Sequence, residues 1–558
     1  MRRLLDPAVD FGRLLRAEWT KLRTVPGWVA TVAGALLAIV AVGLLGTAAS
    51  NPYPGRTELP VGPDGEAVND SFSFVHRELS GDGTLTVPVL GLTGIKAEGK
   101  QGSSPGPVAE WAKAGIIVKA GLDQGSAYAA VAATGGHGVR MQYDYTHDTA
   151  GRPGLPTADA PHWLRLTRAG DTVTGYDSAD GRTWTPIGTA RLPGLPRTVR
   201  VGLFATSPEL AEDTGTGPGL TPAVATGRFG PPVLSDGWTG AGDSGVDGTG
   251  VDGTGADGTG ADGTGADGTG VNGTGVNGTG GAGTGAGDPG AGWTGGRVGT
   301  DAGTSGSYLA GVEAGHTSDA TGFTVTGAGD IAPVVGGPAL AGGRVIENFL
   351  VGTFVGLIAL AVVATGSATA EYRRGLIALT FIAAPRRGRV LFAKSLLLAA
   401  VSLLTGTAAA ALAVPLGTAW STSHGFPVAT VPDAVRLRVV LGTGLVLAAA
   451  AVLALALGFL LRRAAVAITA VVAALVLPYV LATSGALPTG ASEWLLRITP
   501  AAGFAIQQSL PRLPQVATLY TPDSGYYPLS PWAGLAVLTA WAAAALVAAV
   551  LVVRRRDA

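Results

Sequence analysis

The stretch 371–389 reads EYRRGLIALTFIAAPRRGR and separates two long apolar runs. Arginines gather at both of its ends, while its centre, residues 376–384, is apolar and compatible with a helix. Positive charge in a short connection between membrane helices marks the cytoplasmic side. A connection that only reversed the chain would not need an apolar helical centre, so we expect a cytoplasmic partner to dock here. The alternative is a topology anchor without a partner.

Apolar runs long enough to cross a bilayer recur along the 558 residues, of which 47% are hydrophobic and 14% charged. A crossing helix needs about 20 apolar residues, and six runs meet this length: 28–48, 345–370, 390–416, 439–461, 464–483 and 532–553. We therefore predict a helical membrane protein with six transmembrane helices. A cleaved signal peptide is the alternative for the first run, but the preceding segment of about 27 residues is long for an n-region.

Lysine and arginine decide the orientation of these predicted helices. They cluster before the first run, between the second and third, between the fourth and fifth, and after the sixth. All four clusters fall on one side, which the positive-inside rule makes cytoplasmic. Abundant Ala, Gly and Arg are typical of a high-GC bacterial genome. We therefore expect a multi-pass protein of a bacterial plasma membrane with both termini cytoplasmic.

Residues 1–27 predict an amphipathic helix at the inner membrane surface. Phe11, Leu14, Leu15, Trp19 and Leu22 share one helical face, and the basic residues lie on the others. An apolar face flanked by basic side chains is suited to lying in the membrane interface. The segment then leads into the first predicted span, 28–48.

The large segment between the first two runs falls on the outer side and predicts a separate all-β domain. Residues 68–207 contain many short alternating stretches separated by Gly, Asp or Pro, which favours a β-sandwich. Asp180-Gly181 predicts a hairpin turn. Residues 208–300 predict a Gly-rich linker, and 301–343 a connector with one further strand at 323–327 that completes the sandwich. Residues 344–558 then hold helices 2–6 of the membrane part.

A pentapeptide array occupies 246–280, with seven copies of Val/Ala-Asp/Asn-Gly-Thr-Gly. Two glycines in every five residues make ordering costly in entropy, and no large side chain offers area to bury. A flexible linker is the simpler interpretation. Weak cation binding by its aspartates is the alternative, carried by Asp247, Asp252, Asp257, Asp262 and Asp267.

Neither composition nor motifs favour catalysis or nucleic-acid binding by this chain. The net charge is −1 and cysteine is absent, so a bulk attraction to nucleic acid and a thiolate metal site are both excluded. The stretch 94–100 approaches a phosphate-binding loop, but Gln101 stands where a magnesium-binding Ser or Thr is needed. We predict no catalytic residues, no metal and no cofactor, and we expect that the chain is not an enzyme.

Three stretches carry a family resemblance. The first precedes the first span and includes Glu18, Trp19, Lys21 and Arg23. The second is the arginine-rich connection, followed by Lys394, and includes Glu371, Tyr372, Arg373, Arg374, Gly375, Leu376, Pro385, Arg386 and Arg387. The third precedes the last span and includes Glu493, Trp494, Pro500, Gly503 and Phe504. In this order around six spans, they resemble the permeases of bacterial ABC-2 type transporters.

That resemblance implies roles and partners. The first stretch would be the interface helix, the second the loop that couples the permease to an ATPase subunit, and the third a re-entrant outer segment. It implies an ATP-binding-cassette exporter with two ATPase copies and a second permease copy or paralogue. The outer domain departs from the family and resembles concanavalin-like, DUF1349-like sandwiches, some of which bind sugars. A membrane-anchored protein that binds surface or cell-wall glycan is therefore the alternative function.

Overall fold

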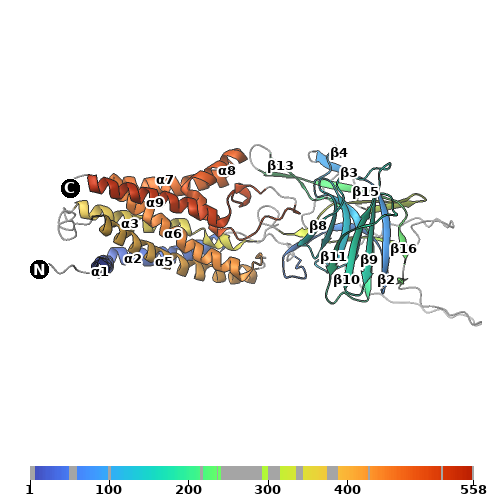
Figure 1. Cartoon of the computed structure of the whole chain (residues 1–558), viewed down its shortest axis with the longest axis horizontal. Helices are drawn as coiled ribbons and strands as arrows, with labels where there is room; N and C mark the ends of the chain where they lie inside the picture. The colour runs from blue at the N-terminus through green and yellow to red at the C-terminus, as the bar shows by residue number, and fades with distance from the viewer. Residues whose placement is uncertain are drawn as a thin grey trace, which may run out of the picture.

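The computed structural model describes residues 7–48, 60–98, 102–213, 218–235, 237–240, 292–299, 315–334, 344–373, 387–424, 426, 428–516 and 520–555. A helical bundle and a β region lie end to end along the longest axis (Figure 1). The first helix, α1 (Pro7–Thr24), and the C-terminal end of the last, α9 (Pro531–Arg555), lie at the bundle end remote from the β region. The array at 246–280 is outside the described residues.

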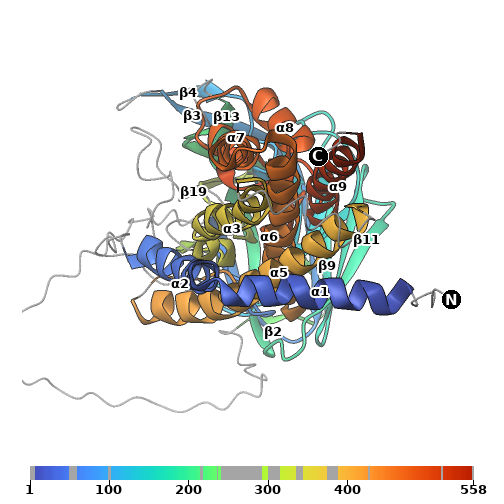
Figure 2. The same ribbon diagram turned by 90° about the vertical axis from the view of Figure 1, so that its left-hand side faces the viewer.

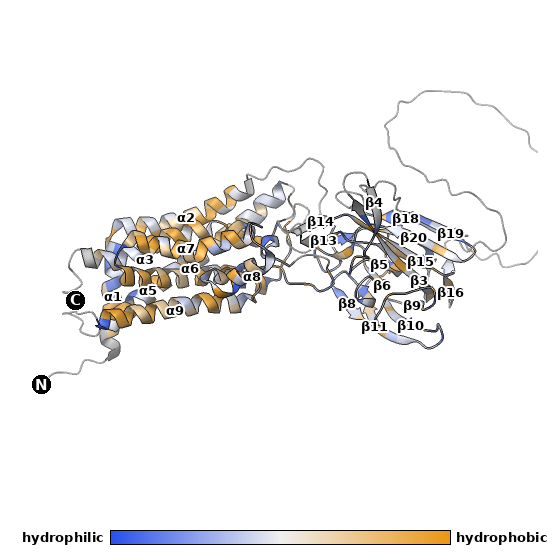
Figure 3. Cartoon of the chain, turned by 90° about the horizontal axis from the view of Figure 1, so that it is seen from above, coloured by the Kyte–Doolittle hydropathy of each residue, from blue (hydrophilic) through white to orange (hydrophobic). Residues whose placement is uncertain are grey.

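Within the described residues, six helices are long and apolar enough to cross a membrane, one for each of the six apolar runs of the sequence. They include α9 and five others: α2 (Pro26–Ala48), α3 (Thr353–Arg373, entered through the 3-10 helix η3, Ile346–Leu350), α5 (Arg387–Ser423), α6 (Asp433–Leu461) and α7 (Ala464–Thr483). Apolar residues cover the bundle along most of its length (Figure 3). The main difference from the sequence prediction is α5, which continues past Pro415 to Ser423.

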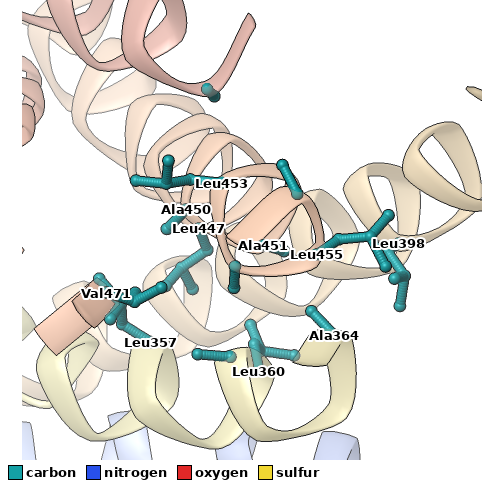
Figure 4. Packing of buried hydrophobic residues seen from close by; sticks show 14 of the residues in the cluster. Leu357, Leu360, Ala364, Leu398, Leu447, Ala450, Ala451, Leu453, Leu455 and Val471 are labelled. Atoms are coloured by element: carbon teal, nitrogen blue, oxygen red, sulfur yellow. The ribbon is translucent and has the colours of Figure 1, made fainter. Parts of the chain in front are cut away.

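Helix α6 forms the centre of the bundle. It packs against α3, α5, α7 and α9, and its alanines and leucines interdigitate with Leu357 and Leu360 of α3, Leu398 of α5 and Val471 of α7 (Figure 4). Small side chains on α6, such as Ala450 and Ala454, allow the backbones to approach closely, as is usual for helix packing in membranes.

The β region consists mainly of antiparallel strands in two large sheets. Its strands are β1 (Val68–Asp70), β2 (Phe72–Ser80), β3 (Gly83–Glu98), β4 (Gly102–Gly106), β5 (Lys113–Lys119), β6 (Tyr128–Thr134), β7 (Gly138–Tyr143), β8 (His147–Ala150), β9 (His162–Ala169), β10 (Thr172–Ser178), β11 (Thr185–Arg191), β12 (Thr198–Thr206), β13 (Leu210–Asp213), β14 (Pro218–Thr221), β15 (Ala223–Phe229), β16 (Val233–Ser235), β17 (Thr239–Gly240), β18 (Thr294–Val298), β19 (Gly315–Asp319), β20 (Gly322–Gly327) and β21 (Ile331–Pro333). One sheet has the order β11-β10-β9-β3-β15-β20-β19, and the other β17-β2-β12-β5-β6-β7-β8.

Apolar side chains from both sheets form one core, as expected for a sandwich. Leu164 of β9 and Val173 of β10 face Ile116 of β5 and Val131 of β6 across this core. Strand β9 alternates buried and partly exposed residues, because successive side chains of a strand point to opposite faces. The hairpin between β10 and β11 encloses Asp180, whose carboxylate accepts the N–H groups of Arg182 and Thr183, both at 2.8 Å.

The sandwich extends beyond residue 207, which corrects the predicted boundary and the linker at 208–300. Strand β15 lies inside that stretch and pairs with β3 on one side and β20 on the other. The sequence Ala223–Phe229 did not stand out, because Gly and Thr dilute its alternation, yet it fills a central position in the sheet. Strand β20 includes residues 323–327, the stretch expected to return to the sandwich.

The two ends of the β region are joined to each other. Strand β1, at its start, pairs with β21, at its end, through Asn69 and Ala332. Buried lysines at the two ends of β5 hold both strands: Lys119 Nζ lies 2.7 Å from Asp70 Oδ2, and Lys113 Nζ lies 2.6 Å from Asp330 Oδ1. The chain therefore enters and leaves the sandwich at adjacent strands.

Candidate functional site

The predicted coupling loop is mostly outside the described residues. Gly375, Leu376, Pro385 and the other loop residues from 374 to 386 belong to this group. For three residues the structure gives only the helical backbone of α3: Glu371, Tyr372 and Arg373. Arg387 is the first residue of α5, and only its backbone is described. The two helices that bracket the loop are therefore placed, while its own contacts are not described.

Helix α1 lies across the end of the bundle, against α5, at the end remote from the β region (Figure 2). Pro7 starts the helix, where proline costs no hydrogen bond, and Pro26 disfavours helical geometry at the residue before it. The Phe11 ring lies 5.9 Å from the Phe392 ring of α5, and Leu22 is buried against the bundle. The predicted amphipathic helix therefore forms, with its apolar side partly on protein.

An ion-pair cluster joins α1 to α5. Glu18 is buried and binds two ammonium groups: Oε1 lies 2.8 Å from Lys21 Nζ, and Oε2 lies 2.9 Å from Lys394 Nζ. The Lys394 side chain is only 4% exposed, whereas that of Lys21 is 45% exposed. One residue of the interface motif, Glu18, thus pairs with the lysine that follows the coupling-loop motif. Trp19, next to Glu18, is exposed.

The charges in this cluster stabilise the ionised form of Glu18. Burial alone raises the pKa of a carboxyl, but the Lys394 ammonium and the hydrogen bond from Lys21 outweigh it, so the pKa of Glu18 is below its ordinary value. Lys21 and Arg23 also lie in the last turn of α1, where positive charge interacts favourably with the helix dipole. Removal of one partner from a buried pair typically costs about 3–5 kcal/mol, so α1 is firmly attached.

The predicted re-entrant segment forms helix α8 (Thr489–Ile498) followed by the 3-10 helix η4 (Pro500–Gln507). With ten residues, α8 is roughly 15 Å long, about half the hydrocarbon thickness. Glu493 pairs with Arg497 at 2.8 Å, and Trp494 is exposed. Pro500 imposes an extended conformation on Thr499, which separates the two helices.

Helix η4 packs tightly on α9 and against the bundle. A Cβ on Gly503 would lie 2.5 Å from Leu538 Cδ2 of α9, and a Cβ on Gly534 would lie 2.2 Å from the Ala502 carbonyl oxygen. Phe504 is buried, with its ring centre 4.7 Å from that of Phe354. The motif residues Pro500, Gly503 and Phe504 are therefore in the core, while Glu493 and Trp494 are nearer the surface.

Beyond η4, the connection to α9 reaches the β region. Gln515 Nε2 donates to the Thr146 carbonyl at 3.1 Å, and Tyr526 and Val516 pack on Ala332 of β21. In the connection between α5 and α6, Thr430 Oγ1 donates to the Gly65 carbonyl at 2.8 Å. The sandwich is thus in direct contact with loops at the near end of the bundle.

Comparisons with known proteins give no family for this chain. No family model matches it, and no curated protein does. Among solved structures, it is similar to a functionally unknown protein from Saccharomyces cerevisiae, with 20% identity over 29% of this chain and 72% of that one and a TM-score of 0.17.

Two peptidase structures show similar likenesses. Scytalido-glutamic peptidase with a transition state analog inhibitor is 11% identical over 30% of this chain and 81% of that one, with a TM-score of 0.21. SCP-B, of the eqolisin family of peptidases, is 11% identical over 30% and 80%, with a TM-score of 0.18. At these TM-scores the likenesses carry no argument about this chain, and the glycan-binding alternative stays a prediction.

Proposed function

We propose that the chain is the permease subunit of an ATP-binding-cassette exporter. It spans the plasma membrane of a bacterium, with both termini cytoplasmic and the sandwich outside. A separate ATPase subunit, present in two copies, hydrolyses ATP, and a second permease copy or paralogue completes the path. The permease itself catalyses no reaction. This proposal rests on the resemblance to ABC-2 permeases together with the geometry of α1 and α5.

The observation that carries the proposal is the attachment of Glu18 to Lys394. Helix α5 begins at the end of the arginine-rich loop, and Lys394 lies two turns into it. A partner that pushed on the loop would therefore displace α5 and α1 together, because a buried ion pair joins them. The remote position of both chain ends relative to the sandwich supports the same orientation (Figure 1).

Co-purification with an ATPase tests this proposal. The tagged chain is purified from the bacterium that encodes it, and the amount of ABC ATPase retained on it is measured. We expect Glu371→Ala and Gly375→Leu to reduce this amount, and Arg463→Ala to leave it unchanged. Arg463 is the matched control, because it is an exposed residue in the short connection between α6 and α7, at the same bundle end.

Two results would contradict the proposal in different ways. If no ATPase co-purifies with the intact chain, the exporter assignment fails. If both loop variants retain as much ATPase as the intact chain, the loop is a topology anchor and the contact lies elsewhere.

A further inference from the structure

A cavity of about 360 Å³ opens at the end of the bundle that faces the β region. Its wall includes residues of η3, α3, α7, α8 and η4, such as Phe354, Tyr479 and Leu496. The segment 522–527, which contains the short 3-10 helix η5 (Pro522–Ser524), also lines the cavity. Cavities of this size hold small ligands in other proteins, which typically use sites of about 300–1,000 Å³.

One carboxylate of a membrane helix lines this cavity. Glu347 lies in η3, and its Oε1 accepts the Ser509 N–H at 3.1 Å. Its Oε2 is enclosed and has no hydrogen bond of standard geometry among the described residues, although the Ser509 hydroxyl is close enough to interact with the carboxylate. Arg438 acts electrostatically on Glu347, but its Nη2 donates to the Gln508 carbonyl at 2.6 Å and forms no ion pair with Glu347. An ionisable group placed this way in a membrane protein typically marks a ligand path.

The other lining residues favour a positive ligand with an apolar body. Among the described lining residues, Glu347 and Asp523 are acidic, and lysine and arginine are absent. The aromatic rings of Phe354, Tyr479 and Tyr527 also line the cavity. Aromatic faces attract cations and at the same time bury hydrocarbon. A carboxylate beside such rings is therefore complementary to an ammonium group attached to an apolar chain or ring.

We propose that this cavity binds an organic ammonium ion with an apolar body, held by an ion pair to the Glu347 carboxylate. That such a compound is the exported substrate rests on the exporter function proposed above, whereas its binding does not. The ammonium group belongs either to a free amphiphilic amine or to the ethanolamine head group of a membrane lipid, and the chemistry at Glu347 is the same for both.

Fluorine NMR of the full-length chain in lipid nanodiscs tests the proposal. The probe is ring-fluorinated phenethylammonium, and its neutral counterpart is the equally fluorinated propylbenzene. We expect the ammonium to bind more tightly than the neutral compound, and Glu347→Gln to weaken the ammonium by about 10- to 100-fold, as expected for the loss of a charged contact. The amide keeps the acceptor oxygen for Ser509, so the melting temperature should stay close to that of the intact chain.

Asp433→Asn is the matched control, because Asp433 carries an exposed carboxylate at the start of α6, outside the cavity lining. We expect it to leave the affinity unchanged. Nanodiscs with phosphatidylglycerol alone or mixed with phosphatidylethanolamine separate the two sources. Equal affinity in both discs supports a free amine, whereas weaker probe binding with phosphatidylethanolamine supports the lipid head group.

Two outcomes would overturn the proposal: neutral and charged probes that bind equally, or a Glu347→Gln variant that binds as tightly as the intact chain. The measurement needs no ATPase. If the binding test fails, the co-purification result is therefore unaffected. If no ATPase co-purifies, the proposed binding site is equally unaffected.

Discussion

Replacement of Lys119 by methionine tests the buried network that joins β1 to β5. The side chains of Lys119 and Asp70 are both 0% exposed, and their charged atoms are 2.7 Å apart. The same Oδ2 accepts the Tyr145 hydroxyl at 2.8 Å and the Gly125 N–H at 2.9 Å. Burial lowers the pKa of Lys119, which Asp70 partly restores. Methionine would leave the Asp70 carboxylate buried with hydrogen bonds but without a counter-charge.

The expected loss follows from that geometry. Removal of one partner from a fully buried pair costs about 3–5 kcal/mol. With a urea dependence of about 3 kcal/mol per molar, the unfolding midpoint of the β region should fall by about 1–2 M. Pulse proteolysis of the full-length chain in increasing urea measures this midpoint, because the folded sandwich resists cleavage.

Two comparison variants make the result decisive. Lys119→Met combined with Asp70→Asn removes the stranded charge, so we expect part of the lost stability to return. Lys96→Met, the same change at a partly exposed position of β3, should shift the midpoint by less than about 0.3 M. The reasoning is refuted if Lys119→Met leaves the midpoint in place, or if the double variant is less stable than Lys119→Met alone.

Two further predictions concern other parts of the chain. Burial, with a contribution from Arg200, lowers the pKa of His76 to about 4. The stability that the neutral ring contributes is therefore complete above about pH 6.5 and is lost as the pH falls toward 4. The urea midpoint of the intact chain should be lower at pH 5 than at pH 7, and this difference should be smaller in the His76→Gln variant. Equal differences in the two proteins would contradict the prediction. In the bundle, Gly503→Leu should cost at least about 1–3 kcal/mol by overpacking against Leu538, measured as a lower melting temperature in detergent. Gly490→Leu, where a Cβ meets open space, is its control, and equal losses in both would argue against tight packing at Gly503.

Hydropathy was sufficient to predict the bundle, because a crossing helix must be apolar over its full length. The strands within 68–207 were predicted as a group, since alternation is clear in stretches such as that of β7. Strand β15 was missed because local alternation is weak there, and its place is decided by pairing with β3 and β20.

Individual polar residues were harder to interpret from the sequence. Lys113 and Lys119 stand at the two ends of an apolar strand, where a lysine is usually exposed, and only the return of β1 and β21 explains their burial. The pairing of Glu18 with Lys394 joins positions more than 370 residues apart. Glu347 was missed, although it is an acid at the start of an apolar run, because its cavity depends on five further segments of the chain: α3, α7, α8, η4 and 522–527.

The pairing of β1 with β21 shortens the effective connection between the first two membrane helices. Nearly 300 residues separate α2 from η3, yet the chain leaves and returns at adjacent strands. The effective length that links the two helices is therefore about 30 residues, which is the sum of the two connectors outside the β1–β21 pair. The cost of closing a loop grows as (3/2)RT ln n, so this shortening reduces it by about 2 kcal/mol. Changes in length within the sandwich, including gain or loss of pentapeptide copies, therefore leave the spacing of the first two membrane helices unaltered.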